Sequence, residues 1–183
     1  VQVAVAAHDG PVYRMEVETT CEDMRTLKDR IRRIESDIET TLESHEVGKL
    51  LTSIDGIGPQ TAAFLVAVYG DPAQYASGAA MAAQAGVVPA LRQSGKRTSQ
   101  RAGCSHVGDP RIRKRLWMPV LAAVQRNAWL RAYYLRLRER GKLPKVALVA
   151  CMRKLFDAIH SVARHRRPFV PHVVMPQPAE ASA

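Results

Sequence analysis

Apolar residues recur near the start of the chain at the spacing of a coiled coil. Steps of three, four, three and four residues separate Met24, Leu27, Ile31, Ile34 and Ile38, with charged residues between them. This heptad pattern predicts a helix over residues 21–47 with one apolar seam. The seam fits coiled-coil pairing, with a second copy of the chain or with another segment of it, and it equally fits docking on the domain core.

Shorter alternations precede this helix. Val1, Val3 and Val5 alternate with other residues, and Asp9 and Gly10 form a turn signal. Residues 1–20 are therefore expected to be two short strands around this turn or a disordered segment. The segment is too short for a domain and is interpreted as a remnant or a disordered end.

The next pattern is a pair of apolar runs joined by a glycine-containing turn. Segment 54–62 reads IDGIGPQTA, with apolar runs on both sides. It predicts a helix-hairpin-helix over residues 49–70, because glycines admit positive φ and Pro59 suits the first turn of a helix. Backbone N–H groups of Gly56, Ile57 and Gly58 would hold a DNA phosphate at this helix start. The alternative is a tight corner between two helices.

Four further helices are predicted, over residues 77–84, 110–127, 128–140 and 144–165. Ser77 and Asp109 are suitable N-caps, and Pro110 suits a first helical position. Residues 86–109 form a loop long enough to be functional, and residues 170–183 are expected to be a disordered tail. The residues expected to be buried in the second and fourth helices are Ile112, Leu116, Val120, Val124, Val146, Val149, Leu155, Ile159 and Val162.

These elements predict a mainly α fold in which an N-terminal coiled-coil helix, residues 21–48, precedes an all-α domain, residues 49–169. The 183 residues carry a net charge of +10, unevenly placed. Residues 90–169 contain 20 Lys and Arg against three acidic residues, whereas residues 1–48 contain 11 acidic against six basic residues. Such asymmetry indicates a polyanionic partner for the C-terminal half, with DNA as the natural candidate.

The cysteine content and the hydropathy of the chain indicate its cellular compartment. Three widely separated cysteines argue against a disulfide framework and favour a reducing environment. No apolar run approaches the roughly 20 residues of a membrane span, and no signal peptide is recognisable. We therefore expect a cytoplasmic protein with no membrane partner.

The candidate nucleophile is a serine in the long loop. Ser94 stands beside Gly95 and is followed by Lys96, Arg97 and Arg101. A serine hydroxyl that attacks a phosphodiester needs cations that hold the developing charge, and this loop supplies them. The alternative is an ordinary loop serine. The three acidic residues of the basic half are too scattered for a two-metal site.

The ordered set of motifs resembles the C-terminal transposase domain of the insertion-sequence 110/116/902 family. The matching segments are residues 54–62 (IDGIGPQTA), 85–89 (AGVVP), 93–96 (QSGK), 108–119 (GDPRIRKRLWMP), 141–142 (GK) and 152–155 (MRKL). They span residues 49–169 in order. The helix over residues 21–47 resembles the coiled-coil linker ahead of that domain.

The resemblance implies a DNA transposase of the DEDD type that uses a structured guide RNA and works as an oligomer, here through the 21–47 helix. It implies that Ser94 attacks DNA, and that Mg²⁺ is held by an N-terminal RuvC-like domain rather than by this chain, which lacks that domain's acidic tetrad. Ser105 and His106 also stand where many members have Ser-Lys. Lys96, Arg97 and Arg101 would neutralise phosphate. Further positioning contacts come from Arg111, Arg113, Lys114 and Arg115.

Two rival interpretations remain at this point. The chain could be a non-catalytic helix-hairpin-helix module that holds DNA by its phosphates alone, or an inactive transposase remnant. It could also be a structural pairing protein built on the 21–47 helix, although the charge of residues 90–169 argues against this.

Overall fold

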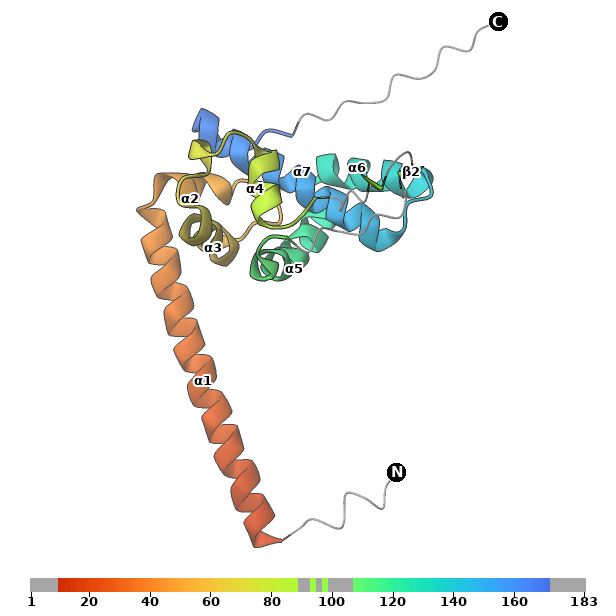
Figure 1. Cartoon of the computed structure of the whole chain (residues 1–183). Helices are drawn as coiled ribbons and strands as arrows, with labels where there is room; N and C mark the ends of the chain where they lie inside the picture. Colours follow the sequence, from red (N-terminus) through yellow and green to blue (C-terminus); the bar gives the residue numbers. More distant parts are fainter. Residues whose placement is uncertain (1–9, 89–92, 95–96, 99–106, 172–183) are drawn as a thin grey trace, which may run out of the picture. The chain divides into compact units, whose positions relative to one another are not determined.

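The computed structural model describes residues 10–88, 93–94, 97–98 and 107–171 of the chain (Figure 1). It divides into two units, Val1–Thr41 and Leu42–Ala183, each taken by itself below. Helices account for nearly all the secondary structure of the described residues, and the predicted mainly α fold is confirmed.

From Pro11 onward, the first unit belongs to one long helix, α1 (Pro11–Glu43), whose last two residues are part of the second unit. It begins ten residues earlier than predicted, so the strand expected after Gly10 is wrong; residues 1–9 lie outside the described residues. Pro11 suits a first helical position because its missing N–H costs nothing there. The helix also ends earlier than residue 47, because His45 caps the next helix with its Nδ1, 3.1 Å from the backbone nitrogen of Gly48.

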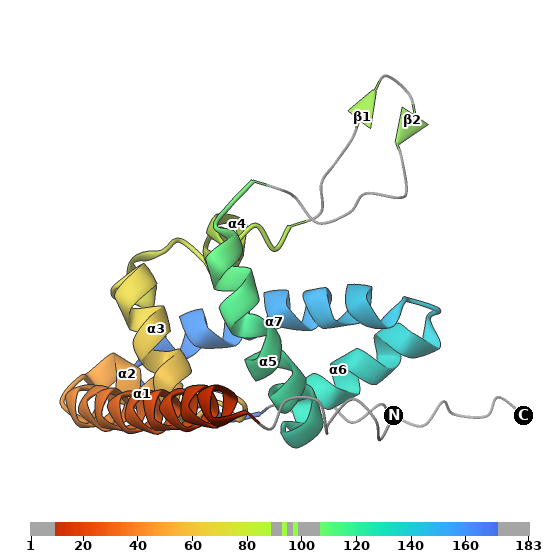
Figure 2. The ribbon, with the colours of Figure 1, turned by 90° about the horizontal axis from the view of Figure 1, so that it is seen from below.

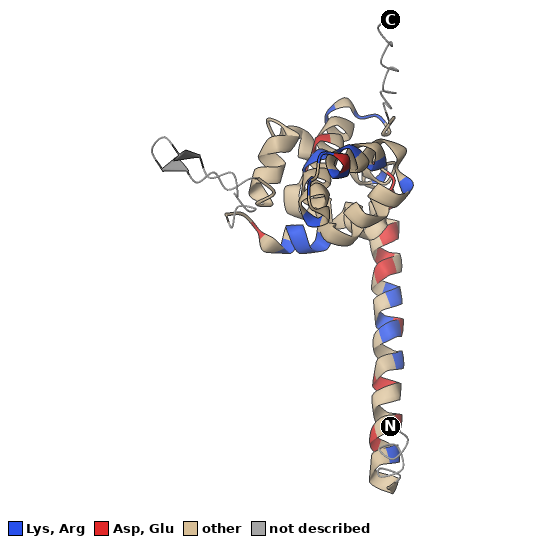
Figure 3. Ribbon diagram, turned by 90° about the vertical axis from the view of Figure 1, so that its right-hand side faces the viewer, with Lys and Arg blue, Asp and Glu red and all other residues tan. Residues whose placement is uncertain are grey.

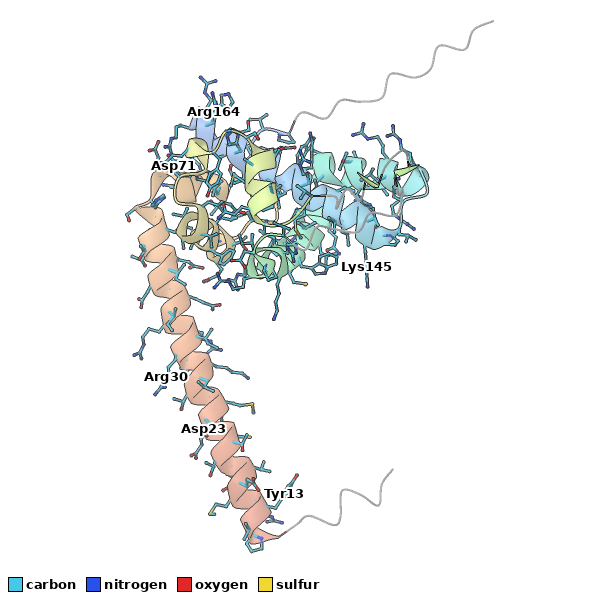
Figure 4. All side chains as sticks on the ribbon, viewed as in Figure 1. Tyr13, Asp23, Arg30, Asp71, Lys145 and Arg164 are labelled. Atoms are coloured by element: carbon cyan, nitrogen blue, oxygen red, sulfur yellow. The ribbon has the colours of Figure 1, made fainter. Side chains whose placement is uncertain are left out.

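The apolar seam of α1 lies open to solvent within its own unit. Met24, Leu27, Ile31 and Ile34 are each 49–58% exposed. Figure 4 shows side chains, among them Tyr13, Asp23 and Arg30, extending outward along this helix. Because the helix starts at Pro11, the same heptad positions continue back to Val17 and Tyr13, which are exposed as well.

The second unit holds the remaining elements. In chain order they are α2 (Glu46–Leu51), α3 (Pro59–Tyr69), the 3₁₀ turn η2 (Pro72–Gln74), α4 (Gly78–Gln84), β1 (Gln93–Ser94), β2 (Arg97–Thr98), α5 (Pro110–Arg126), α6 (Ala128–Glu139) and α7 (Pro144–His165). The bounds predicted for α4 to α7 agree within a residue. This unit begins at Leu42, earlier than the predicted residue 49, because Leu42 is buried in its core.

Helix α7 is the centre of the second unit, packed against α2, η2, α4, α5 and α6 (Figure 2). Lys145 and Arg164 mark its two ends in Figure 4. Its buried face carries Cys151, Met152, Leu155, Phe156, Ile159 and Val162. Val146 is 52% exposed, contrary to the prediction, because the buried face is set one position away, at Ala147 and Leu148. Burial raises the pKa of the Cys151 thiol to about 12.

The helix starts follow the predicted capping signals. Ser77 accepts a hydrogen bond from the backbone nitrogen of Ala80, and Asp109 accepts one from Arg111. Asn127, which is almost fully buried, caps α6 through the nitrogens of Trp129 and Leu130. These side chains satisfy donors that a helix leaves unpaired at its N-terminus.

The segment after α7 returns to the turn between α2 and α3. The backbone nitrogen of Phe169 donates to Ser53 Oγ at 2.7 Å, and its ring meets Trp129 edge-on at 5.4 Å. Arg166, with φ of 50°, forms an ion pair with Asp71. The end of α7 is thereby fixed to α6, to the α2–α3 turn and to the segment before η2.

The turn of residues 52–58 packs on α5 through a glycine. Gly56 has φ of 99°, and a Cβ added to it would lie 2.6–2.7 Å from the Cβ, Cα and nitrogen of Ala123. Gly58 has φ of −82°, and a Cβ there would meet nothing within 4 Å. Gly56 is therefore required by backbone conformation and by close packing, and Gly58 by neither.

Replacing Gly56 with Ala should lower the free energy of unfolding by roughly 3 kcal/mol, because the strain of positive φ and the clash with α5 both act. The matched change Gly58→Ala should cost at most about 1 kcal/mol, the loss of a favourable N-cap glycine. Urea denaturation followed by circular dichroism measures both. Equal losses would mean that the turn does not pack on α5 as described.

Candidate nucleic-acid interface

Two glycines close the base of the long loop. Gly86 and Gly108 both have positive φ, at 68° and 113°, and a Cβ on Gly108 would lie 2.6 Å from Gly86 Cα. Beside them, the backbone nitrogen of Asp109 donates to the carbonyl of Gln84 at 2.8 Å. The loop therefore leaves the helical unit and returns to it at one point, between the end of α4 and the start of α5. We call this point, residues 84–86 and 107–109, the loop neck.

Arg113 joins the loop neck to α5. Its Nη1 donates to the carbonyl of Ala85 at 2.8 Å, and a side chain at Gly86 would collide with the same guanidinium. Arg113 is half-buried, whereas its neighbours Lys114 and Arg115 are exposed. The structure thus shows that Arg113 holds the loop neck, a contact that the sequence did not reveal.

The candidate nucleophile lies in a two-stranded hairpin of this loop. β1 pairs antiparallel with β2, with Gln93 opposite Thr98 and Ser94 opposite Arg97. The register therefore brings the predicted serine and one predicted phosphate-binding residue to facing positions. The other two, Lys96 and Arg101, lie outside the described residues.

The first turns of α5 carry four basic residues, which we call the α5 basic cluster: Arg111, Arg113, Lys114 and Arg115. Arg111 forms a bidentate ion pair with Asp109, with nitrogen–oxygen distances of 2.8–3.1 Å. Hydrogen bonds from the Arg111 side chain and backbone hold the pKa of Asp109 below its usual value. The Arg115 guanidinium lies 5.9 Å from the centre of the Phe64 ring on α3. Among the described residues, Lys114 has no such partner.

The predicted phosphate-binding turn is only partly available. Ile57 is 3% exposed, and its backbone nitrogen donates to the carbonyl of Ile54 at 2.9 Å. In the described part of the chain, no acceptor is bonded to the backbone nitrogens of Gly58 and Gln60 at the start of α3. The Nε2 of Gln60 is also buried there without a partner. Of the three predicted backbone contacts, Gly58 is the best placed for an anion.

The turn of residues 52–58 contacts α5 at a point far from the α5 basic cluster. Gly56 contacts Ala123, ten residues after Arg113, which is roughly 15 Å along a helix. The two sets are therefore too far apart to hold one phosphate between them. Figure 3 shows Lys and Arg in a continuous run on one helix of the second unit, whereas basic and acidic residues are interspersed along α1.

Two other kinds of site find no support in the described ranges. No group of three or more His, Cys, Asp and Glu side chains there could hold a metal ion. No helix in those ranges is long and apolar enough to cross a membrane.

Arg113→Ala should lower the free energy of unfolding by about 2 kcal/mol, because it removes a charge-assisted hydrogen bond that closes the loop neck. The adjacent Lys114→Ala removes the same charge from an exposed position and should change stability by less than about 0.5 kcal/mol. Thermal and urea unfolding of the two variants give the comparison. Indistinguishable stabilities would show that Arg113 does not hold the neck.

Known proteins are similar to this region of the chain. Residues 48–135, which include the turn, the loop and the α5 basic cluster, match the Transposase IS116/IS110/IS902 family. The chain is 30% identical over 155 residues to the pilin gene-inverting protein of Moraxella lacunata, covering 82% of this chain and 48% of that protein. It is 30% identical over 145 residues to a 44.8 kDa protein of insertion element IS116 from Streptomyces clavuligerus, covering 79% and 36%.

A third relative is itself named as a transposase. The probable family 20 transposase of Pseudomonas aeruginosa is 32% identical over 118 residues, covering 60% of this chain and 34% of that protein. The chain thus spans about half the length, or less, of the curated relatives it matches. Residues 48–135 are therefore similar to the transposases of the IS116/IS110/IS902 family.

Proposed function

We propose that residues 42–169 bind the phosphate backbone of DNA with the α5 basic cluster and present Ser94 as the nucleophile of DNA transposition. The observation that carries this proposal is the loop neck. It holds both ends of the loop that carries Ser94 beside the start of α5, so that this loop begins and ends next to the α5 basic cluster.

The proposed reaction is a transesterification. Ser94 Oγ forms a bond to phosphorus, the bond from phosphorus to one deoxyribose oxygen breaks, and that oxygen leaves as a hydroxyl carrying the proton that the serine gave up. One phosphodiester is exchanged for another, so the reverse attack by a different hydroxyl reseals the strand. Arg97, opposite Ser94 in the hairpin, would neutralise the negative charge that develops on phosphate, together with Lys96 and Arg101.

The remaining cations would position the strand without reading its sequence. Lys114 is exposed and unpaired among the described residues, so it contributes a full charge at the surface. Arg111 and Arg115 keep free donors, because a guanidinium has five and each residue uses only some of them. At the start of α3, the backbone nitrogens of Gly58 and Gln60 would take a separate phosphate.

Further parts of the assembly belong to the same proposal. A RuvC-like domain outside residues 42–169 would hold Mg²⁺, and no step proposed for this chain involves that ion. A structured guide RNA would share the basic surface, and the work would take place at the nucleoid in the cytoplasm of a bacterium or archaeon. The alternative function is phosphate binding alone, as in a non-catalytic helix-hairpin-helix module or an inactive remnant.

Ser94→Ala should abolish a covalent protein–DNA adduct and leave DNA affinity within about twofold, because the hydroxyl forms the bond while the cations provide binding. The chain is incubated with labelled DNA and guide RNA, alone and with a RuvC-like domain and Mg²⁺. Denaturing electrophoresis then detects the adduct.

Ser99→Ala, a change of another serine in the same loop, serves as the matched control and should keep the adduct. An adduct that persists in Ser94→Ala would exclude Ser94 as the nucleophile. Salt-sensitive binding with no adduct under any condition would favour the binding-only alternative.

We also propose that α1 pairs with α1 of a second copy. Its seam of apolar residues is exposed over several heptads within its unit, and such a seam is usually buried in a partner helix. Pairing would bring two Ser94 loops into one complex, as an exchange between two DNA strands requires.

Ile31→Glu should weaken self-association at least tenfold, because it places a charge at the centre of the seam. Thr26→Glu adds the same charge off the seam and should leave association unchanged. Sedimentation velocity over a concentration series measures both variants. A native chain that stays monomeric at the highest concentration would contradict pairing through α1.

A further inference from the structure

A cavity of about 420 Å³ opens next to the α5 basic cluster and has no role in the proposed serine chemistry. Its α5 wall is formed by Arg113, Lys114, Trp117 and Met118. Trp117 and Met118 each lie one helical turn, four residues, after Arg113 and Lys114, so the four side chains share one side of the helix. Its other walls are Val149 and Met152 of α7, and Val87 directly after the loop neck.

The cavity combines an apolar interior with a cationic side. Val87 and Met152 are buried, whereas Met118 is 68% exposed and has an adaptable, unbranched side chain. Trp117 is half-buried, and its indole nitrogen donates to no acceptor among the described residues. A site with an aromatic ring, apolar walls and guanidinium and ammonium groups at one side suits a flat, polar-edged ring attached to an anion.

We propose that this cavity binds the base of an unpaired nucleotide whose phosphate lies on Arg113 and Lys114. The inference rests on the proposed function, since it requires that the α5 basic cluster holds a nucleic acid backbone. A base that is stacked and paired in a duplex is not free to enter a cavity, so the occupant is a base of a single strand or a base displaced from a helix. The volume lies within the range of small-ligand pockets.

The charge distribution favours a nucleotide over an apolar peptide side chain. The two basic residues that line the cavity, Arg113 and Lys114, are followed along the chain by Trp117 and Met118, so cation and ring come from one helix. Arg113 is also fixed to the loop neck. A base in the cavity would therefore set the position of its strand relative to the Ser94 loop.

The test compares strands that carry the same phosphates with and without bases. Anisotropy of fluorescently labelled oligothymidine, its abasic analogue, oligouridine and a DNA duplex gives each affinity for the native chain. The native chain should prefer the base-containing strand over the abasic strand about tenfold, the usual contribution of one stacked base. Trp117→Ala should remove this preference and change duplex affinity less than twofold. The stronger of the thymidine and uridine preferences identifies DNA or RNA as the source.

A second measurement covers the case in which Trp117→Ala does not fold. Trp129→Phe leaves Trp117 as the only tryptophan, lies outside the cavity, and should keep the tenfold preference. In this variant the base-containing strand should quench Trp117 fluorescence and the abasic strand should not. Equal native affinities for the two strands, an unchanged preference in Trp117→Ala, or absent quenching would overturn the cavity proposal while leaving the proposed function intact. Failure of the native chain to bind any strand would overturn both.

Discussion

The close contact between Gly86 and Gly108 is the constraint on which the candidate site depends. A Cβ on Gly108 would overlap the backbone of Gly86, and a Cβ on Gly86 would overlap the Val107 carbonyl and the Arg113 guanidinium. The contact makes the end of α4 and the start of α5 neighbours and leaves the intervening residues as a loop tied at one point. The position of the basic residues beside the base of the Ser94 loop follows directly from this contact.

The arginines of the α5 basic cluster are organised by partners within the chain. Arg111 is paired with Asp109, Arg113 is bonded to the Ala85 carbonyl, and Arg115 lies over Phe64. These contacts restrain long side chains that would otherwise lose rotamer freedom on binding, which would lower the entropic cost of the phosphate binding proposed for them. The ion pair with Asp109 orders Arg111 but lowers the net positive charge of the α5 basic cluster. Lys114 is exposed and contributes its full charge, but no contact among the described residues restrains its side chain.

Local signals in the sequence predicted most of the helices, whereas contacts between distant residues decided the site. Ser77, Asp109 and Pro110 are local capping signals, and α4 and α5 begin where these predict. The pairing of Gly86 with Gly108 depends on residues far apart in the chain, and nothing local distinguishes these glycines from others in the loop. Gly56 was predicted for its conformational freedom, and the structure adds a contact with Ala123 that no pattern contains. Val146 was wrongly predicted to be buried. Apolar residues occupy several sides of α7, so the periodicity alone did not determine which side is buried.

The seam of α1 links assembly to the stability of that helix. A helix of 33 residues with polar residues on its other faces gains little from packing within its own unit, and isolated helices depend on partners to bury an apolar stripe. Pairing of two copies would bury Met24, Leu27, Ile31 and Ile34 and so would order α1 and join two serine loops in one step. Strand exchange needs two attacking groups, and a chain with one candidate nucleophile has a chemical reason to be assembled before it reacts.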